Sequence, residues 1–368
     1  MKIVADDKIP FLKGVFEPFA EVVYLKGAAI TPSDVADADA LVVRTRTKCG
    51  AELLAGSRVK FVATATIGYD HIDAEALDKL GVAWRSAPGC NAASVAQYLA
   101  AVLTGFGAPL AGRTLGVVGV GNVGKLAVKV GAALGMRVLL NDPPRAEAEG
   151  EAGFVTLDEV AREADFVTLH VPKVASGKHP TVGLVGEKFF ASAKDGLCLV
   201  NAARGEAVDG AALKAAIRSG KVAHAAVDVW ENEPDIDREL LGLCDFGTPH
   251  IAGYSTDGKA NGTTAAVRAV AEFFGIEELK SFRAVPPPPA NETLLAADEK
   301  APVESELHRL VCHTFDLHKT DAELRADPAA FEKLRGNAPL RREPFAYRVS
   351  GGSPELRSKA AGLGFELV

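Results

Sequence analysis

The stretch Thr114-Leu-Gly-Val-Val-Gly-Val-Gly-Asn-Val-Gly-Lys125 predicts a strand, a tight turn and the start of a helix. Residues 115–118 are apolar and partly β-branched, which favours a buried strand. Helical spacing runs from 125 to 134 and ends at Gly135. A second apolar run, 136–141, follows directly. The stretch therefore predicts one βαβ unit.

The turn of this unit carries three glycines, Gly119, Gly121 and Gly124. A dinucleotide-binding turn needs glycine for the tight bend, for close approach of a pyrophosphate and for packing of the helix on the strand. The N-terminus of the helix then faces the anion. Glycines can also serve close packing alone, but the strand and helix that flank these three favour dinucleotide binding.

An acidic residue, Asp142, lies at the end of the second predicted strand, 18 positions after Gly124. A carboxylate there accepts hydrogen bonds from ribose hydroxyls and repels a 2′-phosphate, which favours NAD over NADP. Arg145 is the one nearby residue that would support NADP.

Composition and charge limit the class of protein. The chain has 368 residues, 48% hydrophobic and 24% charged, which suits two or three globular domains. A net charge of −7 argues against nucleic-acid binding. The apolar segment 95–110 contains Gln97 and Pro109, so it predicts a buried helix and not a membrane span. Five scattered cysteines and an acidic N-terminus predict reduced thiols and a cytoplasmic location.

Strand and helix signals alternate on both sides of the glycine turn. This alternation predicts an α/β protein with two doubly wound parallel sheets, of the Rossmann/flavodoxin-like kind. Four prolines, 286–289, predict a stiff linker to a small C-terminal α+β domain. The predicted domains are 1–92 with 254–284, 93–253 and 285–368.

A polar loop, Arg44-Thr-Arg-Thr-Lys48, follows the third predicted strand. Ligands of open parallel sheets bind at the carboxyl ends of strands, and three cations with two hydroxyls suit a phosphate or carboxylate. From composition alone, a solvated surface loop is an equally good interpretation.

Three charged residues, Arg204, Glu233 and His250, fall at or near predicted strand ends in the second half of the chain. Oxidation of a hydroxy acid needs a base for the hydroxyl proton, and histidine suits that role. A carboxylate beside it would fix its tautomer, and an arginine would bind the substrate carboxylate. Each residue alone has an ordinary structural explanation, but all three after a dinucleotide turn favour a hydride-transfer site.

Several motifs resemble the D-isomer-specific 2-hydroxyacid dehydrogenase family. They are Gly119-Val-Gly-Asn-Val-Gly, Asn201-Ala-Ala-Arg-Gly, Asp228-Val-Trp-Glu-Asn-Glu-Pro and Thr248-Pro-His-Ile-Ala-Gly. Further segments are similar to a branch that oxidises a phosphorylated four-carbon 2-hydroxy acid in pyridoxal phosphate synthesis. They are Val43-Arg-Thr-Arg-Thr-Lys, Ala87-Pro-Gly-Cys-Asn-Ala and Phe331-Glu-Lys-Leu-Arg-Gly-Asn-Ala-Pro-Leu-Arg-Arg-Glu.

The resemblance implies that Arg204, Glu233 and His250 are catalytic, that the C-terminal domain forms a homodimer, and that NAD is the cofactor. Val171 departs from the family, because a threonine is usual there, so only its backbone would serve. The residues expected to contact NAD are Gly119, Gly121, Asn122, Val123, Gly124, Asp142, Val171, Ala202, Ala203, Asp228 and Gly253. Those expected to contact the substrate are Arg44, Thr45, Arg46, Thr66 and Tyr254; Thr45 replaces the usual serine and keeps its hydroxyl.

Two alternatives limit this interpretation. A dehydrogenase for 3-phosphoglycerate or another 2-hydroxy acid would use the same mechanism. A non-catalytic NAD-sensing scaffold, similar to the C-terminal-binding corepressors, would keep the same fold.

For the C-terminal histidines, His308, His313 and His318, a spacing of five residues does not place them on one helix face, so the sequence predicts no metal site.

Overall fold

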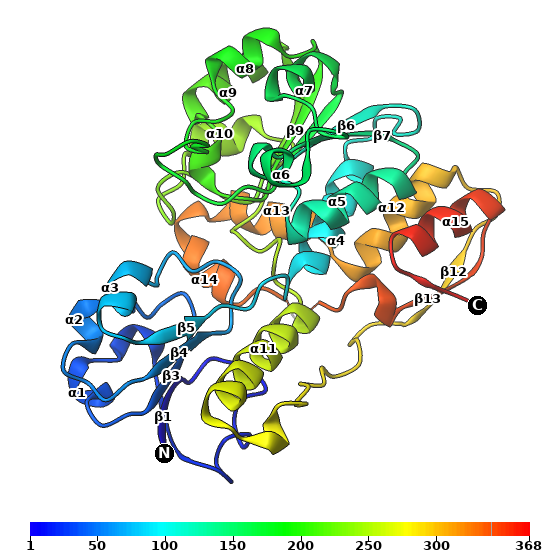
Figure 1. The fold of residues 1–368 in the computed structure, drawn as a ribbon. Helices are drawn as coiled ribbons and strands as arrows, with labels where there is room; N and C mark the ends of the chain where they lie inside the picture. Colours follow the sequence, from blue (N-terminus) through cyan, green and yellow to red (C-terminus); the bar gives the residue numbers. More distant parts are fainter. Residues whose placement is uncertain (340) are drawn as a thin grey trace. The chain divides into compact units, whose positions relative to one another are not determined.

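The computed structural model describes residues 1–339 and 341–368, which form two compact units. The first unit contains residues 1–91 and 255–287, and the second contains 92–254 and 288–368. Every strand pairing in the described chain is parallel. The predicted α/β class is confirmed (Figure 1).

The first unit is built on a five-stranded sheet in the order β2-β1-β3-β4-β5, the order of flavodoxin-like folds. Its strands are β1 (Lys2–Asp6), β2 (Glu21–Leu25), β3 (Ala40–Val43), β4 (Phe61–Thr64) and β5 (Ala83–Arg85). Its helices are α1 (Pro32–Val35), α2 (Ala51–Leu54), α3 (Ala74–Lys79) and α11 (Thr256–Phe274).

Both faces of this sheet are covered. Along β1, Ile3 and Ala5 belong to a core that includes Val267 of α11, and Val4 belongs to a second core with Leu77 of α3. Successive side chains of a strand point to opposite faces, so an apolar run such as β1 feeds both cores. The sheet thus holds the loops that follow β3 and β4 side by side at its carboxyl edge.

The second unit contains a six-stranded sheet in the order β11-β10-β9-β8-β6-β7. Strand order reverses between β6 and β8, and this kind of switch point is where open α/β sheets bind ligands. The strands are β6 (Thr114–Val118), β7 (Arg137–Asn141), β8 (Phe166–Leu169), β9 (Leu197–Asn201), β10 (Val222–Val227) and β11 (Phe246–Gly247).

Helices cover both faces of the second sheet (Figure 1). Helices α4 (Ala92–Gly105) and α5 (Asn122–Ala133) pack on one face. The other face is covered by α7 (Leu157–Glu163), α8 (Glu187–Ser192), α9 (Gly210–Arg218) and α10 (Arg238–Leu243). Helix α5 begins three residues before the predicted start, because Gly121 is its N-cap.

The C-terminal segment, drawn from orange to red in Figure 1, packs against α4 and α5 of the same unit. Leu307 and Leu310 are buried in one core with Leu99 and Leu103 of α4. The three-domain division stays a prediction. The segment contains β12 (Leu294–Ala297), α12 (Val303–Thr314), α13 (Leu317–Ala326), α14 (Phe331–Gly336), β13 (Arg348–Gly351), α15 (Pro354–Gly362) and β14 (Glu366–Leu367).

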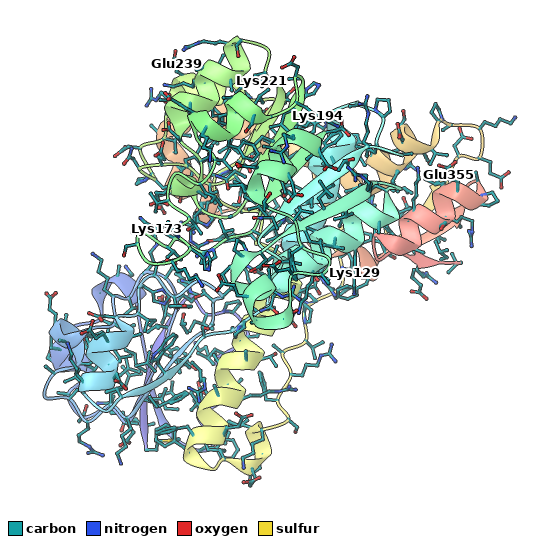
Figure 2. The ribbon with its side chains drawn as sticks, turned by 45° about the horizontal axis from the view of Figure 1, so that its top comes forward. Lys129, Lys173, Lys194, Lys221, Glu239 and Glu355 are labelled. Atoms are coloured by element: carbon teal, nitrogen blue, oxygen red, sulfur yellow. The ribbon has the colours of Figure 1, made fainter. Side chains whose placement is uncertain are left out.

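Charged side chains lie on the outer surface of the second unit, where Figure 2 labels several of them. Lys221 pairs with Asp195 at 2.8 Å, and Glu239 pairs with Lys214 at 2.8 Å. Solvent screens exposed pairs of this kind, so they contribute little to stability. The two buried cores therefore supply most of the stability of this unit.

Candidate active site

The glycine turn between β6 and α5 has one open position. A Cβ at Gly119, where φ is +85°, would lie 2.6 Å from the carbonyl oxygen of His170, and a Cβ at Gly124 would lie 2.0 Å from that of Gly119. A Cβ at Gly121 would meet no described atom within 4 Å. Two glycines therefore serve packing of the turn, and Gly121 leaves the room that a pyrophosphate needs. The turn fits a dinucleotide.

Replacing Gly121 by alanine is expected to weaken NAD binding by at least about tenfold, or about 1.4 kcal/mol. The added methyl group meets no protein atom, so the melting temperature should stay close to that of the wild type. Gly124→Ala is the matched control, because its methyl group overlaps the Gly119 carbonyl and should destabilise the fold by about 1–3 kcal/mol. Fluorescence titration with NAD and thermal melting separate the two effects; unchanged NAD affinity in Gly121→Ala would contradict this assignment.

Asp142 follows β7 and is held against the turn. Its carboxylate accepts hydrogen bonds from the backbone N–H of Val120 at 2.8 Å and of Arg145 at 3.1 Å. The Arg145 side chain is bound to the Val120 carbonyl and to Glu149. Because Glu149 neutralises Arg145, the side chain that would favour NADP is occupied, and the local charge favours NAD.

The loops after β8 and β9 flank the turn and carry three predicted NAD contacts. Val171 lies close to Gly119, since a Cβ there would approach the Val171 side chain at 3.0 Å. Asn201 accepts from the Ala203 N–H at 3.2 Å and donates to the Arg204 carbonyl at 3.0 Å, which fixes the backbone from Ala202 onward. Lys173, labelled in Figure 2, pairs with Glu206 and joins the two loops.

His170, directly after β8, is partly buried beside the turn. Its Nε2 lies 3.0 Å from the Thr168 hydroxyl, and Nδ1 is buried without a hydrogen-bond partner among the described residues. Burial lowers the pKa of His170 to about 4.

This depressed pKa predicts a loss of stability in acid. Between about pH 6.5 and pH 4 the unfolded chain binds a proton at His170 that the folded chain does not, so stability falls as the pH falls through this window. The loss is expected to approach about 1.4 kcal/mol per pH unit. Urea unfolding of wild type and His170→Gln at pH 7, 6, 5 and 4.5 measures it; equal slopes in both proteins would contradict it.

Glu233 and His250 form the centre of the candidate site. Glu233 Oε2 lies 2.7 Å from His250 Nδ1, and Glu233 Oε1 accepts from the Trp230 N–H at 2.9 Å. Since the carboxylate accepts from Nδ1–H, neutral His250 carries its lone pair on Nε2. No described residue hydrogen-bonds to that Nε2, and the His250 side chain is 29% exposed. The imidazole can therefore take a proton from a bound hydroxyl.

Arg204 follows β9, the strand next to β10, and lies at the start of a tightly packed loop. A Cβ at Gly205 would lie 2.1 Å from the Trp230 carbonyl carbon, so the backbone after Arg204 contacts the backbone before Glu233. The structure thus brings the loops of Arg204 and Glu233 together. Arg204 also donates to the Ala203 carbonyl at 2.7 Å.

Asp228 organises the loop that carries His250. Its buried carboxylate accepts from the N–H groups of Ile251 at 2.7 Å and Ala252 at 2.9 Å, and from the Thr248 hydroxyl at 2.6 Å. Burial raises the pKa of Asp228. The side chain is 1% exposed, so these contacts fix the loop; its contact with NAD stays a prediction.

Arg341, from the C-terminal segment, holds the same loop from its carbonyl side. Its Nη2 donates to the Ala252 carbonyl at 2.6 Å and lies 3.1 Å from the Ser94 hydroxyl. The guanidinium lies 3.9 Å from the centre of the Phe315 ring. Residues 251–252 are therefore held between a carboxylate and a guanidinium. Sequence reasoning missed this role of Arg341, because only its place in the C-terminal motif pointed to it.

Gly253 and Tyr254 continue this loop and are partly exposed. The Tyr254 N–H donates to the Ile251 carbonyl at 2.8 Å, and the Arg335 guanidinium lies 5.8 Å from its ring centre. Both residues are in the second unit with His250, and their ligand contacts stay predictions.

In the first unit, the side chains of the polar loop after β3 differ in their exposure. Arg44 binds the buried carboxylate of Asp6 through Nε at 3.1 Å and Nη2 at 3.2 Å. The Thr47 hydroxyl donates to the Gly27 carbonyl at 2.9 Å. The exposed members are Thr45, Arg46 and Lys48. The loop is thus partly structural, and its exposed side chains are the ones suited to an anion.

Thr66 follows β4, the strand beside β3. Its hydroxyl lies 2.9 Å from the Gly68 carbonyl and 2.8 Å from the Thr64 hydroxyl, which in turn lies 3.0 Å from His71 Nε2. The adjacent strand ends therefore place Thr66 near the loop at residues 44–48, within the first unit.

The three C-terminal histidines lie on two helices, and two of them are brought together. Two helices, α12 and α13, divide the segment at residues 315–316. His308 Nε2 lies 3.1 Å from His318 Nε2, and Cys312 lies beside His308. The prediction of no metal site considered only the spacing of the histidines. It left out Cys312, which lies four residues after His308.

Comparisons with known proteins agree with this geometry. Residues 93–252 match the family model described as the D-isomer specific 2-hydroxyacid dehydrogenase, NAD binding domain. The chain is 46% identical to an erythronate-4-phosphate dehydrogenase of Bacteroides fragilis, covering 95% of this chain and 99% of the relative. It is 42% identical to that of Azotobacter vinelandii, with both chains fully covered. No described helix is long and apolar enough to cross a membrane.

Solved structures share the fold. An NAD-bound 3-phosphoglycerate dehydrogenase of Entamoeba histolytica has a TM-score of 0.64 at 27% identity and covers 77% of this chain and 98% of its own. A D-lactate dehydrogenase of Aquifex aeolicus has a TM-score of 0.62 at 27% identity, covering 78% and 100%. The predictions of an NAD-dependent oxidoreductase and of NAD as cofactor are confirmed. The chain belongs to the erythronate-4-phosphate dehydrogenases, within the D-isomer specific 2-hydroxyacid dehydrogenase family.

Proposed function

We propose that the enzyme oxidises the C2 hydroxyl of 4-phospho-D-erythronate to a ketone, giving 3-hydroxy-2-oxo-4-phosphobutanoate in pyridoxal 5′-phosphate biosynthesis. The 2.7 Å contact between Glu233 and His250 is the observation that carries the chemistry. The substrate comes from the names of relatives that match the whole chain.

His250 acts as the base in this proposal. Its Nε2 takes the C2 hydroxyl proton. Bound NAD would supply the acceptor for the hydride that leaves C2. Glu233 accepts the hydrogen bond from Nδ1–H and stabilises the imidazolium that forms. Arg204 binds the substrate carboxylate, since a guanidinium matches a carboxylate in a two-point hydrogen bond. In the reverse direction His250 returns the proton.

The phosphate is assigned to the loop at residues 44–48. The side chains of Thr45, Arg46 and Lys48 are exposed. Arg44 is half-buried and is bound to Asp6. Arg46 and Lys48 supply the positive charge that a phosphate dianion requires, and the Thr45 hydroxyl supplies a further donor. Arg44 then serves to hold the loop in place.

The test is NAD reduction with a set of D-2-hydroxy acids: 4-phosphoerythronate, 3-phosphoglycerate, glycerate and lactate. A 2-oxo acid acceptor is added to a parallel set, so that turnover is detected even where NADH stays bound. We expect the highest kcat/KM for 4-phosphoerythronate. Preference for 3-phosphoglycerate would reassign the substrate and keep the mechanism, and no turnover on any acid would favour the scaffold alternative.

Replacing Arg46 by alanine is expected to raise the KM for 4-phosphoerythronate by roughly 10-fold to 100-fold, because a charge-assisted hydrogen bond contributes about 1.5–3 kcal/mol. Activity on lactate, which has no phosphate, should be unchanged. Arg58→Ala is the matched control: Arg58 is exposed in the same unit and pairs with Asp39. Equal losses on both substrates would show that Arg46 is structural.

We also propose that the enzyme is a cytoplasmic homodimer. Large apolar side chains of the C-terminal segment are exposed, Phe345 by 56% and Val368 by 50%, which supports a partner surface there. None of the five cysteines forms a disulfide bond, as in a reducing compartment. Sedimentation at several protein concentrations tests the dimer, and a single monomeric species would contradict it.

A further inference from the structure

A cluster of metal-binding side chains lies in the second unit, apart from the loops of the candidate active site. His308 and Cys312 are four residues apart on α12, so they lie on one helix face. His318 is in the first turn of α13. One ligand atom from each of the three residues lies within 4.8 Å of the other two. Neither the proposed function nor the NAD site uses any of these residues.

The hydrogen bonds of His308 leave its Nε2 lone pair directed at the cluster. Thr104 on α4 donates its hydroxyl proton to the Ala100 carbonyl at 2.8 Å. Its oxygen therefore accepts from His308 Nδ1–H, which lies 2.9 Å away. The neutral tautomer of His308 then carries its lone pair on Nε2. Metal-bound histidines usually donate their other ring N–H in this way.

Two of the three distances between the ligand atoms are close to the edges of a tetrahedral zinc site, and the third is within 4.8 Å. Zn–N bonds of about 2.05 Å and Zn–S bonds of about 2.3 Å place nitrogen ligands about 3.3 Å apart, and nitrogen and sulfur about 3.6 Å apart. His308 Nε2 and His318 Nε2 are 3.1 Å apart, and His308 Nε2 and Cys312 Sγ are 3.5 Å apart.

One adjustment is needed for binding. Cys312 Sγ lies 3.7 Å from His308 Nδ1, almost as close as it lies to Nε2. The Cys312 side chain must therefore rotate to bring its sulfur to the Nε2 side of the ring. Burial raises the pKa of the Cys312 thiol to about 11, and a hydrogen bond from the Leu317 backbone N–H opposes part of this rise. Binding would release the thiol proton. His318 is exposed, so an ion can reach the cluster from solvent.

We propose that His308, Cys312 and His318 bind one zinc ion. Two imidazoles and a thiolate are the ligands that Zn²⁺ prefers, and three protein ligands leave the fourth position for water. The bound ion joins α12 to α13 and replaces the hydrogen bond between the two histidines. The site therefore stabilises the C-terminal segment and takes no part in hydride transfer.

The test uses the full-length protein after removal of metal with a chelator. Titration with Co²⁺, a spectroscopic substitute for Zn²⁺, should give one equivalent of binding, a sulfur-to-cobalt charge-transfer band and the visible bands of tetrahedral cobalt. Zn²⁺ should displace the cobalt and raise the melting temperature in a concentration-dependent way. Turnover with NAD should be the same with and without zinc.

Three variants distinguish the site from adventitious binding. Cys312→Ser should abolish the charge-transfer band and the zinc-dependent rise in melting temperature. Thr104→Val should weaken zinc binding by roughly 10-fold to 100-fold, because it removes the acceptor that orients His308. His313→Gln is the matched control, since His313 is on α12 and its Nε2 lies 2.8 Å from the Glu292 carbonyl oxygen.

Three results would overturn the proposal. The first is cobalt binding without a sulfur band in the wild type. The second is zinc affinity or thermal stabilisation that is equal in wild type and Cys312→Ser. The third is loss of binding in His313→Gln to the same extent as in Cys312→Ser, because the His313 side chain lies outside the cluster. Each measurement is made on protein whose fold is checked by circular dichroism.

Discussion

Replacing His250 by glutamine is expected to lower kcat by roughly 10²-fold to 10⁴-fold, because the variant loses the base that takes the C2 hydroxyl proton. The Glu233 carboxylate, which lies 2.7 Å from His250 Nδ1 in the wild type, would then face an uncharged amide that cannot hold the proton. Stopped-flow absorbance at the NADH band, with saturating NAD and 4-phosphoerythronate, measures the loss directly.

The control for this variant is its affinity for NAD. His250 lies after β11, whereas the glycine turn and Asp142 follow β6 and β7, so the NAD dissociation constant should stay within about threefold of the wild type. Glu233→Gln should retain more activity than His250→Gln, since the base itself is still present. If His250→Gln lost NAD binding together with turnover, the histidine would be structural.

Replacing Arg341 by methionine is expected to impair the enzyme without touching a reacting group. The variant leaves the Ala252 and Ile251 carbonyls with fewer donors, which should lower the free energy of unfolding by about 1–3 kcal/mol. The loop that carries His250 would then shift relative to Asp228. A displacement of about 1 Å is enough to lower kcat by up to about 100-fold.

Urea unfolding and steady-state kinetics test this prediction together. Arg348→Met is the matched control, because Arg348 is an exposed arginine of the same segment, on β13. That control should retain wild-type stability and kcat. Wild-type kcat in Arg341→Met would show that the Asp228 contacts alone fix the loop, and the role assigned to Arg341 would be wrong.

Local patterns predicted the parts of the fold that depend on neighbouring residues. The strand, turn and helix around Gly119 match their predicted ranges closely, because periodicity and glycine placement act over a few residues. The same local patterns predicted that strands end close to Arg204 and Asp228. Such signals locate a residue at the carboxyl edge of a sheet but not its partners.

Contacts between distant residues were not predictable in this way. Arg341 and Ala252 are 89 residues apart, and no spacing rule connects them. Composition alone suggested that Arg44 binds an anion. The structure shows that the Arg44 side chain binds Asp6, a contact that the sequence did not indicate. In the C-terminal segment, the break between α12 and α13 brings His308 and His318 together, and their separation in sequence argued against that.

The position of Arg341 near the end of the chain has a consequence for protein synthesis. All three predicted catalytic residues are translated before residue 251, but the guanidinium that holds the His250 loop is added about 90 residues later. A nascent chain that stalls in between, or a fragment released early, contains Arg204, Glu233 and His250 and still lacks the support of their loop. We expect full activity to arise only after residue 341 has been translated and its guanidinium can hold this loop.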